Sequence, residues 1–212
     1  MTASGAWSGP LTGLSFVAGL GGAMARSERP YPRPGSSDAE TRRYFAQRSG
    51  APWISVAGQL VSTVALARFT PSVAEYAGSH GRGSRALRAT TLVGGGLAAV
   101  SLAASALTAA TLAGRRGRQQ EPAAVARKAF IAGGPVHGVG FGVLVGALGL
   151  EGLRSGELPR ALAITGLFAA GANVLSPLYL LAEPAGWLIP IGRFSGYLVI
   201  GIAGPRIARR AT

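Results

Sequence analysis

The stretch TTLVGGGLAAVSLAASALTAATLAG, residues 90–114, decides the fold because it contains no charged residue. About 20 apolar residues, each adding ~1.5 Å of helical rise, cross the ~30 Å hydrocarbon core of a bilayer. A second uncharged stretch covers residues 161–182. A soluble fold rarely buries two uncharged stretches of this length. Residues 90–113 and 161–182 are therefore predicted to be membrane-spanning helices.

Similar apolar stretches occupy most of the remaining chain and are separated by short, arginine-rich connections. The stretch 7–25 contains an apolar run as long as the core of a signal peptide. The first ten residues contain no Lys or Arg, which a signal peptide would have there, so we expect a retained helix. The predicted fold is all-α, a polytopic transmembrane helix bundle of about six spans that forms one domain over residues 1–212. The predicted spans are 7–25, 53–70, 90–113, 129–150, 161–182 and 187–207.

The charge composition supports a membrane location. Only 14% of the residues are charged and 48% are hydrophobic, whereas soluble proteins carry about 25% charged residues. All but one of the 21 basic residues are arginines, which together with the abundant Ala and Gly is typical of a GC-rich bacterial genome. We therefore expect a multi-pass protein of the bacterial plasma membrane.

The net charge of +13 raises the question of which anions the protein contacts. Nucleic acid is not expected as a partner, because the basic residues punctuate the spans on both sides of the bilayer. Arginine at a span end instead contacts anionic lipid headgroups and resists translocation. The basic residues divide almost evenly between the two sides. They weakly favour external termini, although the basic tail 206–210 favours the opposite orientation.

The longest connection, residues 26–52, is predicted to contain a short helix outside the bilayer. Ser37 and Glu40 have the spacing of a capping box, in which each side chain bonds the other residue's backbone amide. An interfacial helix is expected over about 38–49, with Tyr44 and Phe45 dipping into the bilayer and arginines on phosphates. A solvated connector is the alternative.

Glycine recurs every four residues in the fourth apolar stretch, at Gly134, Gly138, Gly142 and Gly146. Residues four apart share one helix face, and small residues there let a second backbone come close. The repeat predicts a glycine zipper, meaning a packing face used either within the chain or in a homo-oligomer. A ligand lying against the same face is the alternative.

His137, in the same stretch, is the only ionisable side chain between Lys128 and Glu151. A titratable side chain inside a membrane is costly and therefore becomes a functional candidate. Its imidazole can donate from one nitrogen and accept at the other. The alternative is a structural role, in which His137 bonds a neighbouring helix; Pro135 favours this role because it leaves a carbonyl near Ile131 without a donor.

Arg193, six residues after Trp187 in the last stretch, is the second candidate. It lies about 9 Å along the helix from that interfacial residue, so it can either snorkel to the headgroups or bind an anion inside the bundle. A buried Arg193 would need a carboxylate partner, and Glu183 is the nearest in sequence. Polar residues of other spans complete the predicted ligand site, which comprises His137, Arg193, Gln59, Asn173 and Tyr179.

Several classes of chemistry are excluded or disfavoured by missing residues. The chain has no cysteine, which excludes thiolate ligands and cysteine nucleophiles. Two histidines without acidic residues inside the spans do not make a metal site. We expect no metal and no cofactor.

Several short motifs together resemble a known group of proteins. The motifs are residues 32–35, residues 58–62 with 68–70, residues 132–138, residues 156–160 and residues 190–194. With these motifs the chain resembles the uncharacterised six-span integral membrane proteins of actinobacteria, over most of its length. The resemblance implies membrane residence and an all-helical bundle, and it brings no activity, cofactor or catalytic residue.

The sequence leaves three functions open. The first is binding or passage of a lipophilic or anionic small molecule within the bundle. The second is an enzyme that acts on a lipid-like substrate with His137 as base, which requires a second polar side chain within hydrogen-bond reach. The third is a structural or oligomerising membrane protein without a ligand.

Overall fold

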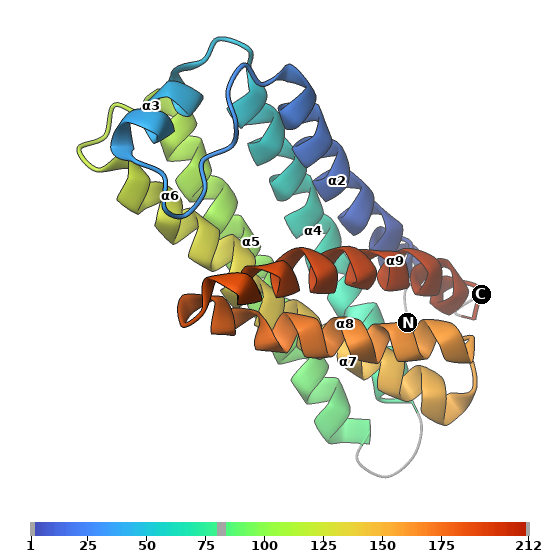
Figure 1. Cartoon of the computed structure of the whole chain (residues 1–212). Coiled ribbons are helices and arrows are strands. Elements are labelled where there is room, and N and C mark those ends of the chain that lie inside the picture. The colour runs from blue at the N-terminus through green and yellow to red at the C-terminus, as the bar shows by residue number, and fades with distance from the viewer. Residues whose placement is uncertain (1–2, 80–83, 211–212) are drawn as a thin grey trace.

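The computed structural model describes residues 3–79 and 84–210, and within these ranges all regular structure is helical (Figure 1). Residues 1–2, 80–83 and 211–212 lie outside the described part. The elements are α1 (Ala3–Ala6), α2 (Ser8–Arg26), α3 (Asp38–Ala46), α4 (Ala51–Ala77), α5 (Ser84–Gly114), α6 (Pro122–Ile131), the π-helical turn η1 (Ala132–Val136), α7 (His137–Ser155), α8 (Arg160–Leu175), the 3₁₀ turns η2 (Ser176–Leu180) and η3 (Glu183–Trp187), and α9 (Leu188–Ala208).

The number of helices suited to span a membrane is four or five in the described residues, so the predicted six spans are not confirmed. Four runs are long and apolar enough: Ser84–Gly114, Pro122–Ser155, Arg160–Leu180 and Glu183–Ala208. A fifth results only if α3 and α4, bent by 86°, are counted together. The predicted span 7–25 does form a helix, α2. α2 is not among these four runs, so its role as a span is not confirmed.

The helices pack in two groups that cross each other. In the first group α2 packs along α4 and α4 along α5; in the second α7 packs along α8 and α8 along α9. α7 joins the groups on one side by packing on α5, and α9 joins them on the other by packing on α2. Figure 1 shows α8 and α9 side by side across the direction of α2. The last two helices, joined by η2 and η3, therefore form an antiparallel pair.

Glycines determine how closely α7 approaches its neighbours. A Cβ added at Gly138 would lie 2.7 Å from the hydroxyl of Ser176, and one at Gly142 would lie 2.9 Å from Cβ of Asn173. On another face of the helix, a Cβ at Gly140 would meet the backbone of α5 at 2.6 Å. Side chains at these three positions would hold the helices apart, so Gly138 and Gly142 of the repeat, and Gly140 beside it, allow close packing within this chain. Their use in a homo-oligomer stays a prediction.

The segment that includes α3 covers one end of the bundle. The predicted capping box is confirmed: the Ser37 side chain accepts from the Glu40 amide, and the Glu40 carboxylate accepts from the Ser37 amide at 2.8 Å. Tyr44 and Phe45 are buried against Leu112 of α5 and do not face outwards. The expected contact of these rings with the bilayer is therefore not seen, because each ring buries a large apolar area when it packs in a protein core. α3 thus packs on α5 and α6.

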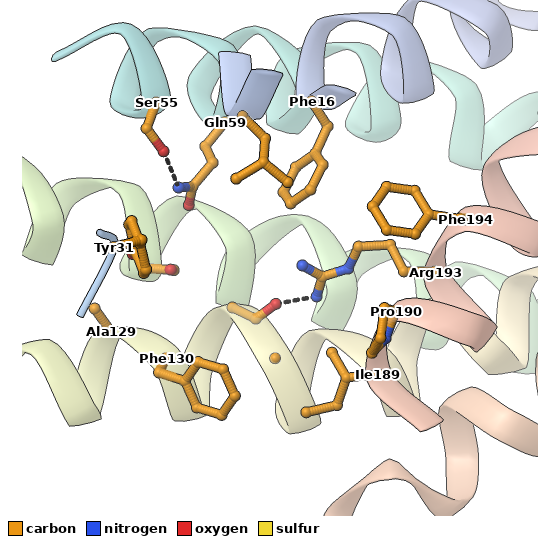
Figure 2. Close-up of a pocket in the computed structure, with 14 residues that line it drawn as sticks. Phe16, Tyr31, Ser55, Gln59, Ala129, Phe130, Ile189, Pro190, Arg193 and Phe194 are labelled. Carbon is orange, nitrogen blue, oxygen red and sulfur yellow. Dashed lines mark hydrogen bonds between the residues drawn. The ribbon is translucent and has the colours of Figure 1, made fainter. Parts of the chain in front are cut away.

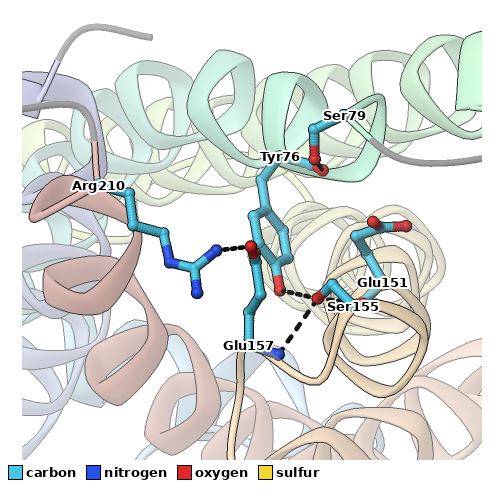
Figure 3. A network of polar contacts seen from close by, with 6 residues as sticks. All are labelled: Tyr76, Ser79, Glu151, Ser155, Glu157 and Arg210. Carbon is cyan, nitrogen blue, oxygen red and sulfur yellow. Dashed lines mark hydrogen bonds and ion pairs between the residues drawn. The ribbon is translucent and has the colours of Figure 1, made fainter.

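At the opposite end, polar contacts connect α4, α7 and α9 near both termini (Figure 3). The hydroxyls of Tyr76 and Ser155 lie 3.2 Å apart, and the Glu157 amide donates to the Ser155 hydroxyl at 3.3 Å. Arg210 forms an ion pair with Glu157. The network fixes the C-terminal end of α9 to the connection between α7 and α8.

Candidate functional site

A cavity of about 220 Å³ lies where α9 and η1 meet the first helix group (Figure 2). We call it the Arg193 cavity. Side chains from α2, α4, α5, α6 and α9 and from the segment before α3 form its walls, so residues far apart in the sequence meet there. Its lining residues are Phe16, Leu20, Tyr31, Ser55, Gln59, Ser105, Ala129, Phe130, Gly133, Gly134, Ile189, Pro190, Arg193 and Phe194.

Arg193 is the only charged residue of this lining. Its side chain is 8% exposed, and Nη2 donates to the carbonyl oxygen of Gly133. The guanidinium carbon lies 4.9 Å from the ring centroid of Phe16, which is the geometry of a cation–π contact. Nε is buried and has no hydrogen-bond partner among the described residues. The guanidinium is therefore held in place but only partly satisfied.

No carboxylate pairs with Arg193, although all eight Asp and Glu residues lie in the described ranges. Glu183, the partner expected for a buried Arg193, is exposed at the start of η3. Arg193 does not snorkel either, since it lies in the protein interior. A buried cation without an ion-pair partner is costly, because burial removes the hydration that stabilises the charge.

The acceptor for Arg193 comes from the irregular part of the long α6–α7 helical run. The sequence Gly133-Gly134-Pro135 lies in the π-helical turn η1. Pro135 has no amide hydrogen, so the regular hydrogen-bond ladder cannot pass through it, and π turns are frequent at functional sites. A Cβ at Gly133 would lie 2.8 Å from Cβ of Ser105. The absence of a side chain lets α5 approach and leaves the Gly133 carbonyl accessible to Arg193.

The opposite part of the cavity carries uncharged polar groups. The Gln59 side-chain amide donates to the Ser55 hydroxyl at 3.3 Å, and both residues belong to α4. The Tyr31 side chain projects into the same part of the cavity (Figure 2). Arg193 and Gln59, both predicted from the sequence, thus line one cavity. Phe16 and Phe130 add apolar surface to the same cavity.

His137 lies outside this lining and is fully buried. Nδ1 lies 2.9 Å from the carbonyl oxygen of Ala98 on α5, while Nε2 is buried without a partner among the described residues. The imidazole stacks on Phe141 with centroids 5.5 Å apart. The bond to another helix corresponds to the structural role considered for His137, with Ala98 as the acceptor in place of Ile131.

Asn173 and Tyr179 also lie outside the lining, but both pack against the cavity wall. Asn173 is buried, and its side-chain amide donates to the Ala169 carbonyl at 2.9 Å. It contacts α9 at Gly192, directly before Arg193. The ring of Tyr179 lies edge-on to Phe130, with centroids 5.5 Å apart. Both residues support the cavity wall in this structure.

Most lining residues of the cavity were not predicted as site residues, and Phe16, Tyr31 and Gly133 are three of them. Phe16 and Tyr31 are ordinary aromatic residues in an apolar and a proline-rich segment, and nothing local indicates that they line one cavity with Arg193. Gly133 supplies a backbone carbonyl, which no side-chain pattern reveals. The neighbouring Pro135 was the available signal, because it indicates a disturbed hydrogen-bond ladder.

Comparisons with protein-family models, curated proteins and solved structures gave no match to this chain.

Proposed function

We propose that this protein is an integral membrane protein that binds a lipophilic or anionic small molecule in the Arg193 cavity. The observation that carries the proposal is the buried guanidinium of Arg193, which lines a cavity and has no carboxylate partner. A ligand oxyanion would supply the missing charge. The apolar walls would strengthen that interaction, because water does not screen it there.

The cost of the arrangement supports a role in binding. Replacing buried ionic groups with apolar ones of similar size is often neutral or stabilising, so packing alone does not account for an arginine here. Phe16 and the Gly133 carbonyl offset part of this cost and fix the guanidinium in one position. A preorganised donor loses less side-chain entropy when its ligand arrives.

The other functions are less well supported. An enzyme using His137 as base would need a second polar side chain near the imidazole, whereas its bond runs to the Ala98 backbone. A structural protein without a ligand would not account for the cavity or for the buried Arg193 that lines it without a carboxylate partner. Residence in a bacterial plasma membrane, headgroup contacts by the arginine-rich connections and membership of the actinobacterial six-span group stay predictions.

Arg193→Met tests the proposal, with Arg206→Met as the matched control. Arg206 lies on the same helix, is exposed, and donates to the Ile202 carbonyl of its own helix. The probe is decanoate in phosphatidylcholine nanodiscs, and bound probe is counted by native mass spectrometry. A hydrogen bond to a charged group contributes about 1.5–3 kcal/mol, so Arg193→Met should weaken binding at least tenfold while Arg206→Met binds like wild type.

Two further measurements make the result decisive. Gly134→Leu should block the cavity, because a Cβ at Gly134 fits at 3.6 Å from Ile189 and a larger side chain fills the space beyond. Thermal unfolding without probe should show Arg193→Met at least as stable as wild type. The proposal is wrong if both cavity variants remain folded and bind decanoate as wild type does, or if no probe binds to wild type.

A further inference from the structure

We infer that the ligand is a monoanionic amphiphile whose carboxylate binds Arg193 and whose chain leaves the cavity toward the lipid between α2 and α9. The inference rests on the proposed function and names its ligand class. It combines the charge of the cavity, the contacts that hold the guanidinium, and the exposed apolar residues of α2 and α9 beside the lining.

The charge of the ligand follows from the lining. Arg193 contributes one positive charge, and the lining contains no other Lys or Arg and no Asp or Glu. A carboxylate would neutralise the site. A dianionic phosphate monoester would bring a second charge into apolar surroundings without a cation to balance it, and an amine would add a second positive charge.

The shape of the head group follows from how Arg193 is held. The Phe16 ring covers one face of the guanidinium at 4.9 Å, and Nη2 is bonded to Gly133. A ligand therefore approaches along the edge of the guanidinium plane. In Figure 2 the guanidinium extends from α9 into the space bounded by Phe16, Gln59 and Tyr31. A planar carboxylate matches the paired N–H groups of arginine with two parallel hydrogen bonds.

The exit of the chain follows from the size of the cavity and from its rim. A volume of about 220 Å³ is below the ~300–1,000 Å³ of sites that enclose a drug-sized ligand. It holds a head group with its first carbons. Phe194 lines the cavity and is 44% exposed, and Ile191 on the same face of α9 is 43% exposed. On α2, Val17 next to the lining residues is 45% exposed. These exposed apolar side chains of α2 and α9 lie beside the lining residues and mark where the ligand chain would leave the cavity.

A head-group series with one chain length tests the charge. Decanoate, decanol, decylamine and decyl phosphate are compared at equal mole fractions in phosphatidylcholine nanodiscs at pH 8. Decanoate should bind at least tenfold more tightly than each of the others. Arg193→Met should reduce the difference between decanoate and decanol to less than threefold, and Arg206→Met should preserve it. Equal binding of decanol, or tighter binding of decyl phosphate, would overturn the inference while the proposed function survives.

A chain-length series tests the exit. If the chain remains in lipid, carboxylates of ten to sixteen carbons should bind within threefold of one another, because the added methylenes stay in the same environment. A closed cavity would instead exclude the longer chains, and a sharp loss of binding with length would refute the exit of the chain toward lipid. Failure of every probe, of any charge or length, would refute the proposed function itself.

Discussion

Gly192→Ala examines whether the close packing of α9 on α8 positions Arg193. An added Cβ would lie 2.7 Å from Cγ of Asn173 and 2.8 Å from its backbone nitrogen. Ordinary contacts between carbon atoms are ~3.5–4.0 Å, so the neighbouring atoms must move by about 1 Å. Because one of them belongs to the backbone of α8, rotation of the Asn173 side chain alone does not relieve the contact. The two helices must separate.

The expected cost can be isolated with a control on the same helix. Overpacking in a close-packed interior costs about 1–3 kcal/mol, whereas replacing Gly by Ala in a helix gains up to ~1 kcal/mol. Gly201→Ala makes the same chemical change on α9, where an added Cβ has nothing within 4 Å. The propensity gain cancels in the comparison. Gly192→Ala should therefore be about 1–3 kcal/mol less stable than Gly201→Ala.

Reversible unfolding in mixed micelles with increasing dodecyl sulfate, followed by circular dichroism, measures this difference. Decanoate binding should fall in Gly192→Ala, because the shift of α9 moves the next residue, Arg193. In Gly192→Ala with Asn173→Ala, only part of the stability should return, since the backbone nitrogen remains in place. Equal stability of Gly192→Ala and Gly201→Ala, with unchanged decanoate binding, would refute the reasoning.

Three other outcomes are expected. Ser37→Ala should cost about 0.5–2 kcal/mol of local helix stability, which would be seen as faster amide exchange in α3. Hydrogen bonds from Ser37 also lower the pKa of Glu40. The stabilisation of α3 by the Glu40 carboxylate is therefore complete above the ordinary pKa of a glutamate and is lost as the pH falls through the lowered pKa. Exchange protection of α3 that does not change between pH 7 and pH 2 would contradict this. His137→Ala should destabilise the fold by about 2–4 kcal/mol in the unfolding assay, with decanoate binding within twofold of wild type. A double-mutant cycle on Glu157 and Arg210 should give a coupling of at most about 1 kcal/mol that shrinks in 1 M salt, since the pair is partly exposed.

The positions of the helices were predictable because they depend on neighbouring residues. The uncharged run that begins at Thr90 lies within α5, and the capping residues Ser37 and Glu40 lie at the start of α3. The short connection around Glu183 joins α8 to α9. The count of six spans was not confirmed, because helicity and apolarity are separate properties. α2 and α4 are both helical, yet neither is by itself among the four runs that are long and apolar enough to span a membrane.

The candidate site was predictable only in part. Intramembrane charge singled out Arg193, and polarity singled out Gln59; both line the cavity. The same criterion selected His137, which lies outside the lining and bonds α5. Polarity inside a span indicates that a side chain needs a partner. It does not distinguish a ligand from a backbone carbonyl on a neighbouring helix.

The sequence by itself determined that apolar helices dominate this protein, because hydrophobic runs, caps and breakers act over a few residues. Only the tertiary structure decided that Arg193 meets Phe16 and the Gly133 carbonyl and has no carboxylate beside it. These contacts join residues 60 or more positions apart along the chain. They depend on how closely the glycine-containing helices approach, a distance set by packing between helices and not by any one of them.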